Sequence, residues 1–371
     1  MHSCATRAPA VMEFYRREPF LLVSWFAFTT FSAVHSASSC NRFNPIYAFG
    51  DSTTDTGNQV RMSPGSPAMQ LPYGETYFRR PTGRYCDGRL MVDFLTTSLN
   101  EGLLPPHLGT PIGGASENFA VAGATALDLQ SLQTIAGVTS TTPISLDLQI
   151  SAFNQDSQAM NLSNSLVYFG EIGGNDYNYA LGARRSMDVV SSLINPVMQR
   201  ISTGLSDIID RGVKHIVVQG EFPMGCISLY THVLNGSATD SNGCIVSVNQ
   251  ISNEHNRQLK SLISDISGKH EDVEIVFFDT SSAYIHVLEN AKAYGFTNLF
   301  DPCYPGGLGL IPGAPSNTTE GAGPCSNPQN YVGWDGVHLT EAMYRTLMKL
   351  FLKGHNYASP SSNFLTRCTR I

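Results

Sequence analysis

Short apolar runs alternate with longer amphipathic segments along most of this 371-residue chain. Each run is bounded by Gly, Asp, Asn or another polar residue, and the five runs are residues 46–49, 119–121, 166–169, 216–218 and 273–278. Strands of a parallel sheet are covered on both faces, so they are apolar along their whole length rather than at alternate positions. The five runs are therefore predicted to be buried parallel strands.

Helices are predicted between these strands. Residues 189–209 and 248–266 carry apolar side chains at spacings of three and four, which is the pattern of an amphipathic helix, and residues 341–353 repeat it near the C-terminus. The order strand, helix, strand predicts an α/β fold, a three-layer α/β/α sandwich around a central, mostly parallel, five-stranded sheet. Ligands of such sheets bind beyond the carboxyl ends of the strands, so functional residues are expected there.

Residues 1–37 have the features of a secretory signal peptide. Arg16 and Arg17 precede an apolar run at residues 20–34, and small residues follow it. The run is shorter than the ~20 residues that a membrane helix needs, so no stable membrane anchor is expected after cleavage. An uncleaved anchor is the alternative, and Met12 is a second possible start. Residues 38–371 contain no repeat or low-complexity linker and are predicted to form a single domain.

Seven of the eight cysteines lie beyond this leader, where disulfides can form on the secretory route. Two bridges are predicted across loops rich in Gly, Asn, Ser or Pro: Cys226 with Cys244, and Cys303 with Cys325. A further bridge between Cys40 and Cys368 would leave Cys86 as the odd thiol. Zinc is disfavoured because the chain has no C-x-x-C pair and no H-x-x-x-H companion, and no metal is expected.

Glycosylation signals bear on the compartment of the protein, and its charge distribution bears on the class of partner that it can bind. Three sequons agree with a secreted protein, extracellular or in an endomembrane lumen such as the vacuole: Asn161, Asn235 and Asn317. The net charge of -7 is spread along the chain, and no basic cluster is interleaved with aromatic residues. A nucleic acid is therefore excluded as a partner, and a small or neutral molecule is expected.

A polar cluster follows the first predicted strand, at residues 49–58. Ser52 lies in it, and a serine on a strand-to-helix turn can project its hydroxyl above the sheet edge, close to backbone N–H groups that could bind an oxyanion. A Gly-Asp-Ser tripeptide is equally suited to a turn with a helix cap, so the rest of the chain has to decide between the two interpretations.

A second cluster precedes the last predicted helix, at residues 334–340. Asp335 and His338 are three residues apart, so the carboxylate can hold one ring nitrogen of the imidazole and leave the other for a serine hydroxyl. The alternative is a helix entry with a turn Asp and a surface His. Of the other histidines only His255 is kept as a reserve candidate, because the rest have no acid similarly placed in a Gly-containing loop.

Two more clusters follow the second and third predicted strands. Gly123 could bring a backbone N–H close to a ligand, and the Asn175 side chain could donate to a developing negative charge. Each alone is merely a Gly-rich loop. Neither is followed by Gly-Lys-Ser/Thr and the spacing G-x-G-x-x-G is absent, so a P-loop and a Rossmann site are excluded.

Four motifs in order resemble the blocks of the GDSL esterase/lipase family within the SGNH hydrolases: Gly-Asp-Ser at 50–52, Asn-Phe-Ala-x-x-Gly-Ala at 118–124, Gly-Gly-Asn-Asp at 173–176 and Asp-Gly-Val-His at 335–338. Through residues 72–78 and 80–89 the chain is most similar to the plant branch that includes sinapine esterases and acetylajmalan esterase. This resemblance implies the flavodoxin-like SGNH hydrolase fold.

The resemblance also implies a role for each matching residue. Ser52 would be the nucleophile, Asp335 and His338 would complete the triad, and the oxyanion hole would consist of the Ser52 and Gly123 N–H groups with the Asn175 amide. The fourth residue of the name motif is Thr53 rather than Leu, which should alter local packing without loss of chemistry. Cys86, where the family more often has a small residue such as Ser, is a second departure.

The expected activity is hydrolysis of a carboxylic ester, of a small molecule or a lipid, through an acyl-enzyme and with no cofactor. An acyltransferase would use the same residues, and a catalytically silent secreted binding protein would keep only the cleft. Aromatic residues near the motifs would suit a flat acyl group or would pack in the core: Tyr73, Tyr77, Phe78, Tyr177, Tyr179 and Trp334.

Overall fold

The computed structural model describes residues 43–109, 116–306, 322–353, 356–361 and 363–365, all of which belong to one compact unit. The predicted signal peptide, Cys40, Cys368 and Asn317 lie outside these residues. None of the described helices is both long and apolar enough to cross a membrane.

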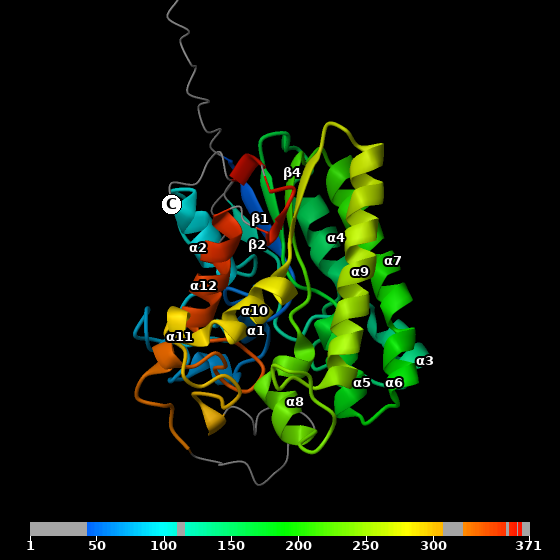
Figure 1. Cartoon of the computed structure of the whole chain (residues 1–371). Helices are drawn as coiled ribbons and strands as arrows, with labels where there is room; N and C mark the ends of the chain where they lie inside the picture. Colours follow the sequence, from blue (N-terminus) through cyan, green and yellow to red (C-terminus); the bar gives the residue numbers. More distant parts are fainter. Residues whose placement is uncertain (1–42, 110–115, 307–321, 354–355, 362, 366–371) are drawn as a thin grey trace, which may run out of the picture. The chain divides into compact units, whose positions relative to one another are not determined.

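A single sheet runs through the centre of the described residues, in the order β2-β1-β3-β4-β5-β6 (Figure 1). Its strands are β1 (Ile46–Phe49), β2 (Glu117–Asn118), β3 (Leu166–Phe169), β4 (His215–Gln219), β5 (Glu274–Phe278) and β6 (Ala358–Ser359). The first five are parallel, and β6 pairs antiparallel with β5 at the edge. The order 2-1-3-4-5 of the parallel strands is that of flavodoxin-like folds, as predicted.

The predicted sheet needs two corrections. It has six strands in the described residues rather than five, because β6 is a two-residue strand without an apolar run. The second strand is Glu117–Asn118 and not residues 119–121. The Asn118 side chain accepts a hydrogen bond from the N–H of Ala120, at 2.9 Å, and this turn takes the apolar residues that follow out of the sheet.

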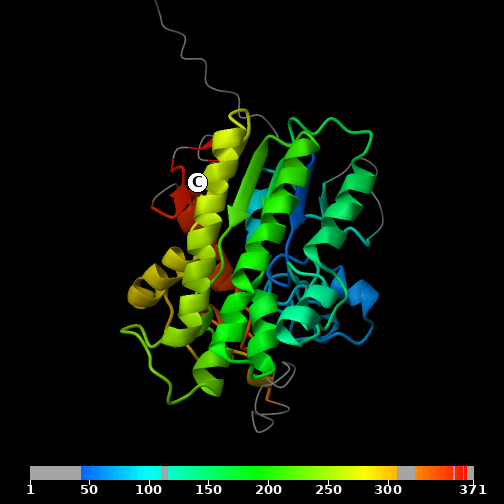
Figure 2. The ribbon, with the colours of Figure 1, turned by 90° about the vertical axis from the view of Figure 1, so that its right-hand side faces the viewer.

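Helices cover both faces of the sheet, as predicted for a three-layer sandwich (Figures 1 and 2). On one side lie α2 (Met91–Ser98), α10 (Thr280–Glu289) and α12 (Glu341–Leu352), and on the other lie α4 (Leu146–Asp156), α7 (Ile194–Asp210) and α9 (Val246–Lys269). The shorter helices are α1 (Gln59–Met62), α3 (Leu129–Ala136), α5 (Gly174–Gly182), α6 (Met187–Ser192), α8 (Ser228–Val233) and α11 (Ala291–Tyr294).

Two hydrophobic cores fill the spaces between the layers, because alternate residues of each strand point to opposite faces. In β3, Val167 and Phe169 contribute to the core under α4, α7 and α9, whereas Leu166 and Tyr168 contribute to the core under α2, α10 and α12. All four side chains are at most 1% exposed. This double burial is the reason for the uninterrupted apolar runs in the sequence.

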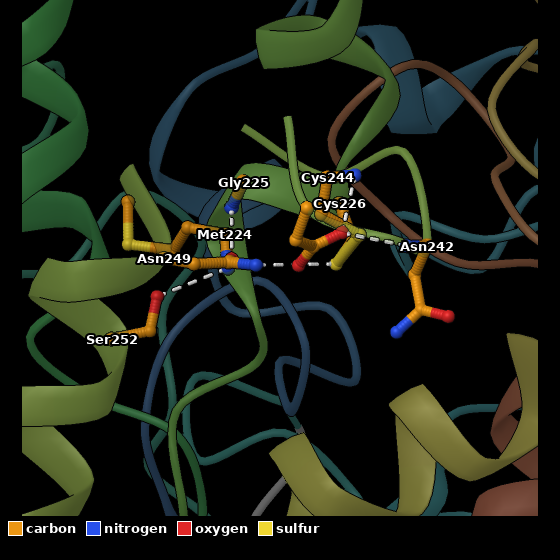
Figure 3. The surroundings of a disulfide bond; sticks show 8 residues. Met224, Gly225, Cys226, Asn242, Cys244, Asn249 and Ser252 are labelled. Carbon is orange, nitrogen blue, oxygen red and sulfur yellow. Dashed lines mark hydrogen bonds between the residues drawn. A yellow bond between two sulfur atoms is a disulfide. The ribbon is translucent and has the colours of Figure 1, made fainter. Parts of the chain in front are cut away.

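Both predicted disulfides in the described residues are formed, Cys226–Cys244 and Cys303–Cys325, and Cys86 is a buried free thiol. Figure 3 shows how α9 holds the first bridge. The Asn249 side chain accepts from the N–H of Gly225 at 2.8 Å, and the hydroxyl of Ser252 accepts from the N–H of Met224 at 3.0 Å. The bridge therefore fixes the segment that leads from β4 to α8.

Replacing Cys226 and Cys244 together by serine should lower the free energy of unfolding by about 3 kcal/mol, because the unfolded chain regains the freedom of the closed loop. The bridge spans 18 residues of sequence. Urea unfolding of the non-reduced proteins measures the difference. Cys86→Ser removes a thiol but no bridge and should cost much less, so equal losses for the two variants would contradict a stabilising role of the bridge.

Candidate active site

Three loops meet at the carboxyl ends of neighbouring strands. The chain leaves β1 toward β2 but leaves β3 toward β4, in opposite directions along the sheet, and a crevice forms at such a switch point. Ser52 follows β1, Gly123 follows β2, and Asn175 lies in the first turn of α5 after β3. The sheet topology therefore brings together residues that are more than fifty positions apart in sequence.

The Ser52 loop is a tight turn that starts at Gly50. Gly50 has a φ of +136°, and a Cβ on it would lie 2.8 Å from the carbonyl oxygen of Glu171, so a side chain here would collide with the neighbouring loop. The carbonyl of Asp51 accepts from the N–H groups of Thr54 and Asp55 at 3.1 and 2.8 Å. These bonds fold the chain around Ser52, which is 7% exposed.

The side chain of Asp335 closes the loop that carries Asp335 and His338. Oδ1 of Asp335 accepts from the N–H groups of Val337 and His338 at 3.1 and 2.9 Å. Helix α12 begins three residues after His338, and Thr340 caps it by accepting from the N–H of Met343. The backbone on either side of the His338 imidazole is thus fixed, by the hydrogen bonds of Asp335 on one side and by the capped helix α12 on the other.

A continuous hydrogen-bond chain joins the two loops. Nδ1 of His338 lies 2.7 Å from Oδ2 of Asp335, and Nε2 of His338 lies 2.8 Å from Oγ of Ser52. Burial alone would raise the pKa of Asp335, but His338 and the other donors on the carboxylate outweigh it and lower that pKa below its ordinary value. Asp335 is therefore a carboxylate at neutral pH and favours the imidazole tautomer with its proton on Nδ1.

A cavity of about 770 Å³ opens over this chain. All five predicted site residues line it: Ser52, Gly123, Asn175, Asp335 and His338. Among the described residues, no acceptor lies on the N–H of Ser52 or on that of Gly123. Gly123 has a φ of +82°, and a Cβ there would meet Thr141 and Tyr179 at 2.8 and 3.0 Å, so this position requires glycine.

Asn175 also lines the cavity, but both hydrogens of its side-chain amide are already donated to other acceptors. Nδ2 donates to Oδ2 of Asp51 at 3.1 Å and to the carbonyl of Ala124 at 3.0 Å. Donation to a third acceptor therefore requires that one of these bonds be shared or released.

Residues 46–351 match the family described as GDSL-like Lipase/Acylhydrolase. The chain belongs to this GDSL family. A GDSL esterase/lipase of Arabidopsis thaliana is 36% identical over 364 residues, which cover 92% of this chain and 92% of the relative. Sinapine esterase of Brassica napus is 35% identical over 361 residues, which cover 91% and 92%.

A crystal structure of phospholipase A1 from Streptomyces albidoflavus NA297 also matches, at 15% identity and a TM-score of 0.35, over 70% of this chain and 89% of that one. The predicted resemblance to plant GDSL esterases is confirmed by the family and its named relatives. This GDSL protein is a carboxylic ester hydrolase.

The departure at Thr53 changes hydrogen bonding in this GDSL chain. Both the N–H and the hydroxyl of Thr53 donate to Oδ1 of Asp51, at 2.8 and 3.0 Å. A leucine could supply only the first of these bonds. Thr53 therefore adds a polar contact to Asp51, which is 3% exposed.

Three buried carboxyl groups lie beside Ser52: Asp51, Glu171 and Glu221. Glu171 interacts electrostatically with both of the others. Burial raises the pKa of Asp51 well above its usual range, with Glu171 adding to the effect, and burial raises the pKa of Glu221 to about 7. Burial of Asp51 therefore favours its protonated, uncharged form next to Asn175.

Two further acids, which the sequence did not single out, connect the loops of this site by hydrogen bonds. Oδ2 of Asp55 accepts from the N–H of Ala122 at 2.9 Å, which ties the Ser52 loop to the Gly123 loop. Asp176 accepts from the N–H groups of Ala126 and Leu127 at 2.8 and 3.0 Å, which ties the Asn175 loop to the same segment. Their place within the predicted motifs was the only available signal.

Other predicted residues have different surroundings. His255 is buried in α9 with its Nδ1 2.9 Å from the Tyr177 hydroxyl, and burial lowers its pKa to about 3, so it stays neutral. Of the six aromatic residues considered for the substrate, Tyr73 and Tyr179 line the cavity. Tyr177 and Trp334 are fully buried, and Tyr77 and Phe78 lie under Arg89 and Arg84.

One cluster away from the cavity has metal-ligand residue types. His107, Glu117 and Asp156 place ligand atoms within 4.8 Å of one another, and no other group of three does so among the described residues. Nδ1 of His107 lies 3.1 Å from Glu117 and 3.2 Å from Asp156. Contacts between the imidazole and the two carboxylates account for this geometry.

Proposed function

We propose that this GDSL hydrolase is a secreted serine esterase in which Ser52 attacks the ester carbonyl, His338 moves the protons and Asp335 orients His338. The hydrogen-bond chain from Asp335 through His338 to Ser52, at 2.7 and 2.8 Å, carries this proposal. Its reacting end lies in a cavity large enough for a small-molecule ligand.

In the first half of the proposed reaction, Nε2 of His338 takes the proton of Ser52 as Oγ bonds to the carbonyl carbon. The protonated imidazole then gives this proton to the leaving alcohol, and an acyl-enzyme remains. In the second half water takes the place of the alcohol, and the same proton transfers release the acid and regenerate Ser52. Asp335 keeps its negative charge throughout and stabilises the imidazolium.

The oxyanion is proposed to accept from the N–H groups of Ser52 and Gly123 and from the Asn175 amide. An anionic oxygen attracts an N–H donor roughly twice as strongly as a neutral acceptor does. Because the Ala124 carbonyl is a neutral acceptor, the amide can turn the hydrogen that it donates there toward the oxyanion when it forms.

Asn175→Ala should lower kcat by about 100-fold to 1,000-fold with little change in KM, because the lost donor acts on the transition state. Steady-state kinetics on a chromogenic ester measures this effect. Asn178→Ala is the matched control, since this amide lines the same cavity one turn later in α5. Equal rates for wild type and Asn175→Ala would remove Asn175 from the proposed oxyanion hole.

Secretion is proposed from the predicted signal peptide, the disulfides and the glycosylation sequons. The predicted signal peptide precedes the domain. Two disulfides are formed, and disulfides persist in oxidising compartments. Two of the predicted sequons, Asn161 and Asn235, are exposed, as glycosylation at either site would require.

The substrate is proposed to be an uncharged ester of small-molecule size. Among the described residues that line the cavity, the charged types are Asp335, His338 and Arg184, and the first two belong to the proposed triad. Tyr85, Tyr179 and Tyr230 supply aromatic surface around the nucleophile.

A panel of short-acyl, long-acyl and hydroxycinnamoyl esters, each incubated with and without a competing alcohol, tests the proposed function. Free acid should be the main product in water for at least one ester. An acyltransferase would instead yield mainly the new ester when the alcohol is present, and a binding protein would convert none of the panel.

A further inference from the structure

Tyr73 contacts the proposed triad from a distant part of the chain. Its hydroxyl donates to Oδ2 of Asp335 at 2.9 Å, across 262 residues of sequence. This is the carboxylate oxygen that also accepts from Nδ1 of His338. The tyrosine is 2% exposed, so its hydrogen bond is shielded from bulk water.

The surroundings of Tyr73 hold its ring in one orientation. The ring makes edge contacts with Tyr85, Tyr304 and Trp334, with centroids 5.7, 5.9 and 6.2 Å apart. The N–H of the following Gly74 donates to the carbonyl of Cys86 at 2.9 Å, which anchors the loop. Since Trp334 directly precedes Asp335, the same aromatic cluster places both partners of the hydrogen bond.

Asp335 thus receives four hydrogen bonds, two on each oxygen. Oδ1 accepts from two backbone N–H groups, and Oδ2 accepts from the ring of His338 and from the Tyr73 hydroxyl. Burial, together with the neighbouring Asp335, raises the pKa of Tyr73 well above its ordinary value, so this hydroxyl stays a donor over the whole working range. The Tyr73 bond is the only one of the four made by a side chain outside the Asp335 loop.

We infer that Tyr73 is a positioning residue of the esterase, which fixes the Asp335 carboxylate and withdraws part of its negative charge from His338. The inference rests on the proposed triad. A hydrogen bond to a carboxylate spreads its charge, so His338 binds its proton less tightly than it would beside a carboxylate without this donor.

Tyr73→Phe should move the acid limb of the kcat/KM profile upward by about half a pH unit and lower kcat on the plateau by about tenfold, with KM nearly unchanged. The other titratable groups around Tyr73, Asp335 and His338 are present in both proteins: Tyr85, Tyr179, Tyr304 and Asp55. Tyr304→Phe is the matched control, because its ring packs in the same cluster while all four donors on Asp335 remain. The control should change neither quantity.

The inference would be overturned if Tyr73→Phe had the same pH profile and the same plateau kcat as wild type. A lower kcat without any shift of the acid limb would also contradict it, and would show that Tyr73 is only a packing residue.

A double-mutant cycle gives a second readout. In an Asp335→Asn background, Tyr73→Phe should have no further effect on kcat, because the group through which it acts is gone. Failure of the triad itself would appear separately, as full activity of Ser52→Ala.

Discussion

Ser52→Ala is expected to lower kcat for ester hydrolysis by on the order of 10⁵-fold to 10⁶-fold, because the proposed acyl-enzyme forms on the hydroxyl that is removed. Only the oxyanion donors and substrate binding would remain to accelerate attack by water. KM should change little, since the removed hydroxyl acts on the transition state. Steady-state and single-turnover kinetics on the same ester measure the loss.

Ser140→Ala is the matched control for this substitution. Ser140 lines the same cavity, but its hydroxyl donates to the carbonyl of Thr142 and not to an imidazole. The control should keep its rate within about twofold of wild type, as expected for an alcohol that takes no part in the chemistry. Loss of activity in Ser140→Ala with retention in Ser52→Ala would move the nucleophile away from residue 52.

Asp335→Asn is expected to lower kcat by about 10⁴-fold while the protein stays folded. The side chain keeps its shape, but its amide can donate to Nδ1 of His338, and the ring proton then moves to Nε2. Nε2 faces Oγ of Ser52 at 2.8 Å, so a proton there prevents the imidazole from acting as a base.

The pH profile separates this explanation from simple unfolding. The amide that replaces the Asp335 carboxylate carries no charge to stabilise the imidazolium, so the variant should depend on hydroxide and its residual rate should rise with pH. The unfolding temperature should stay within a few degrees of wild type, and kcat close to the wild-type value would show that His338 does not need Asp335.

Part of the fold follows directly from local sequence patterns. The strands Ile46–Phe49 and Leu166–Phe169 coincide with the predicted apolar runs, because both faces of these strands are buried. The predicted helix at 189–209 is two helices, α6 and α7, which meet at Leu193. Pro196 lies in the first turn of α7, where its missing N–H is tolerated, so the apolar periodicity continues across a real break.

The candidate site residues stand out in the sequence, but the contacts that support them in the structure do not. Ser52, Asp335 and His338 stand in short motifs whose residue types suggest their chemistry. The Tyr73 bond to Asp335 depends on how two loops 262 residues apart pack together, and no local pattern encodes that contact. Trp334, considered for the substrate because of its place beside Asp335, is instead 0% exposed and packs against Tyr73.

The most direct test of the central claim is to label the secreted protein with a fluorophosphonate and to locate the probe by mass spectrometry. A serine activated by His338 should react once per chain, on Oγ of Ser52, and His338→Ala should abolish the labelling. An enzyme that hydrolyses esters yet carries the probe on another residue, or carries none, would contradict the proposed triad.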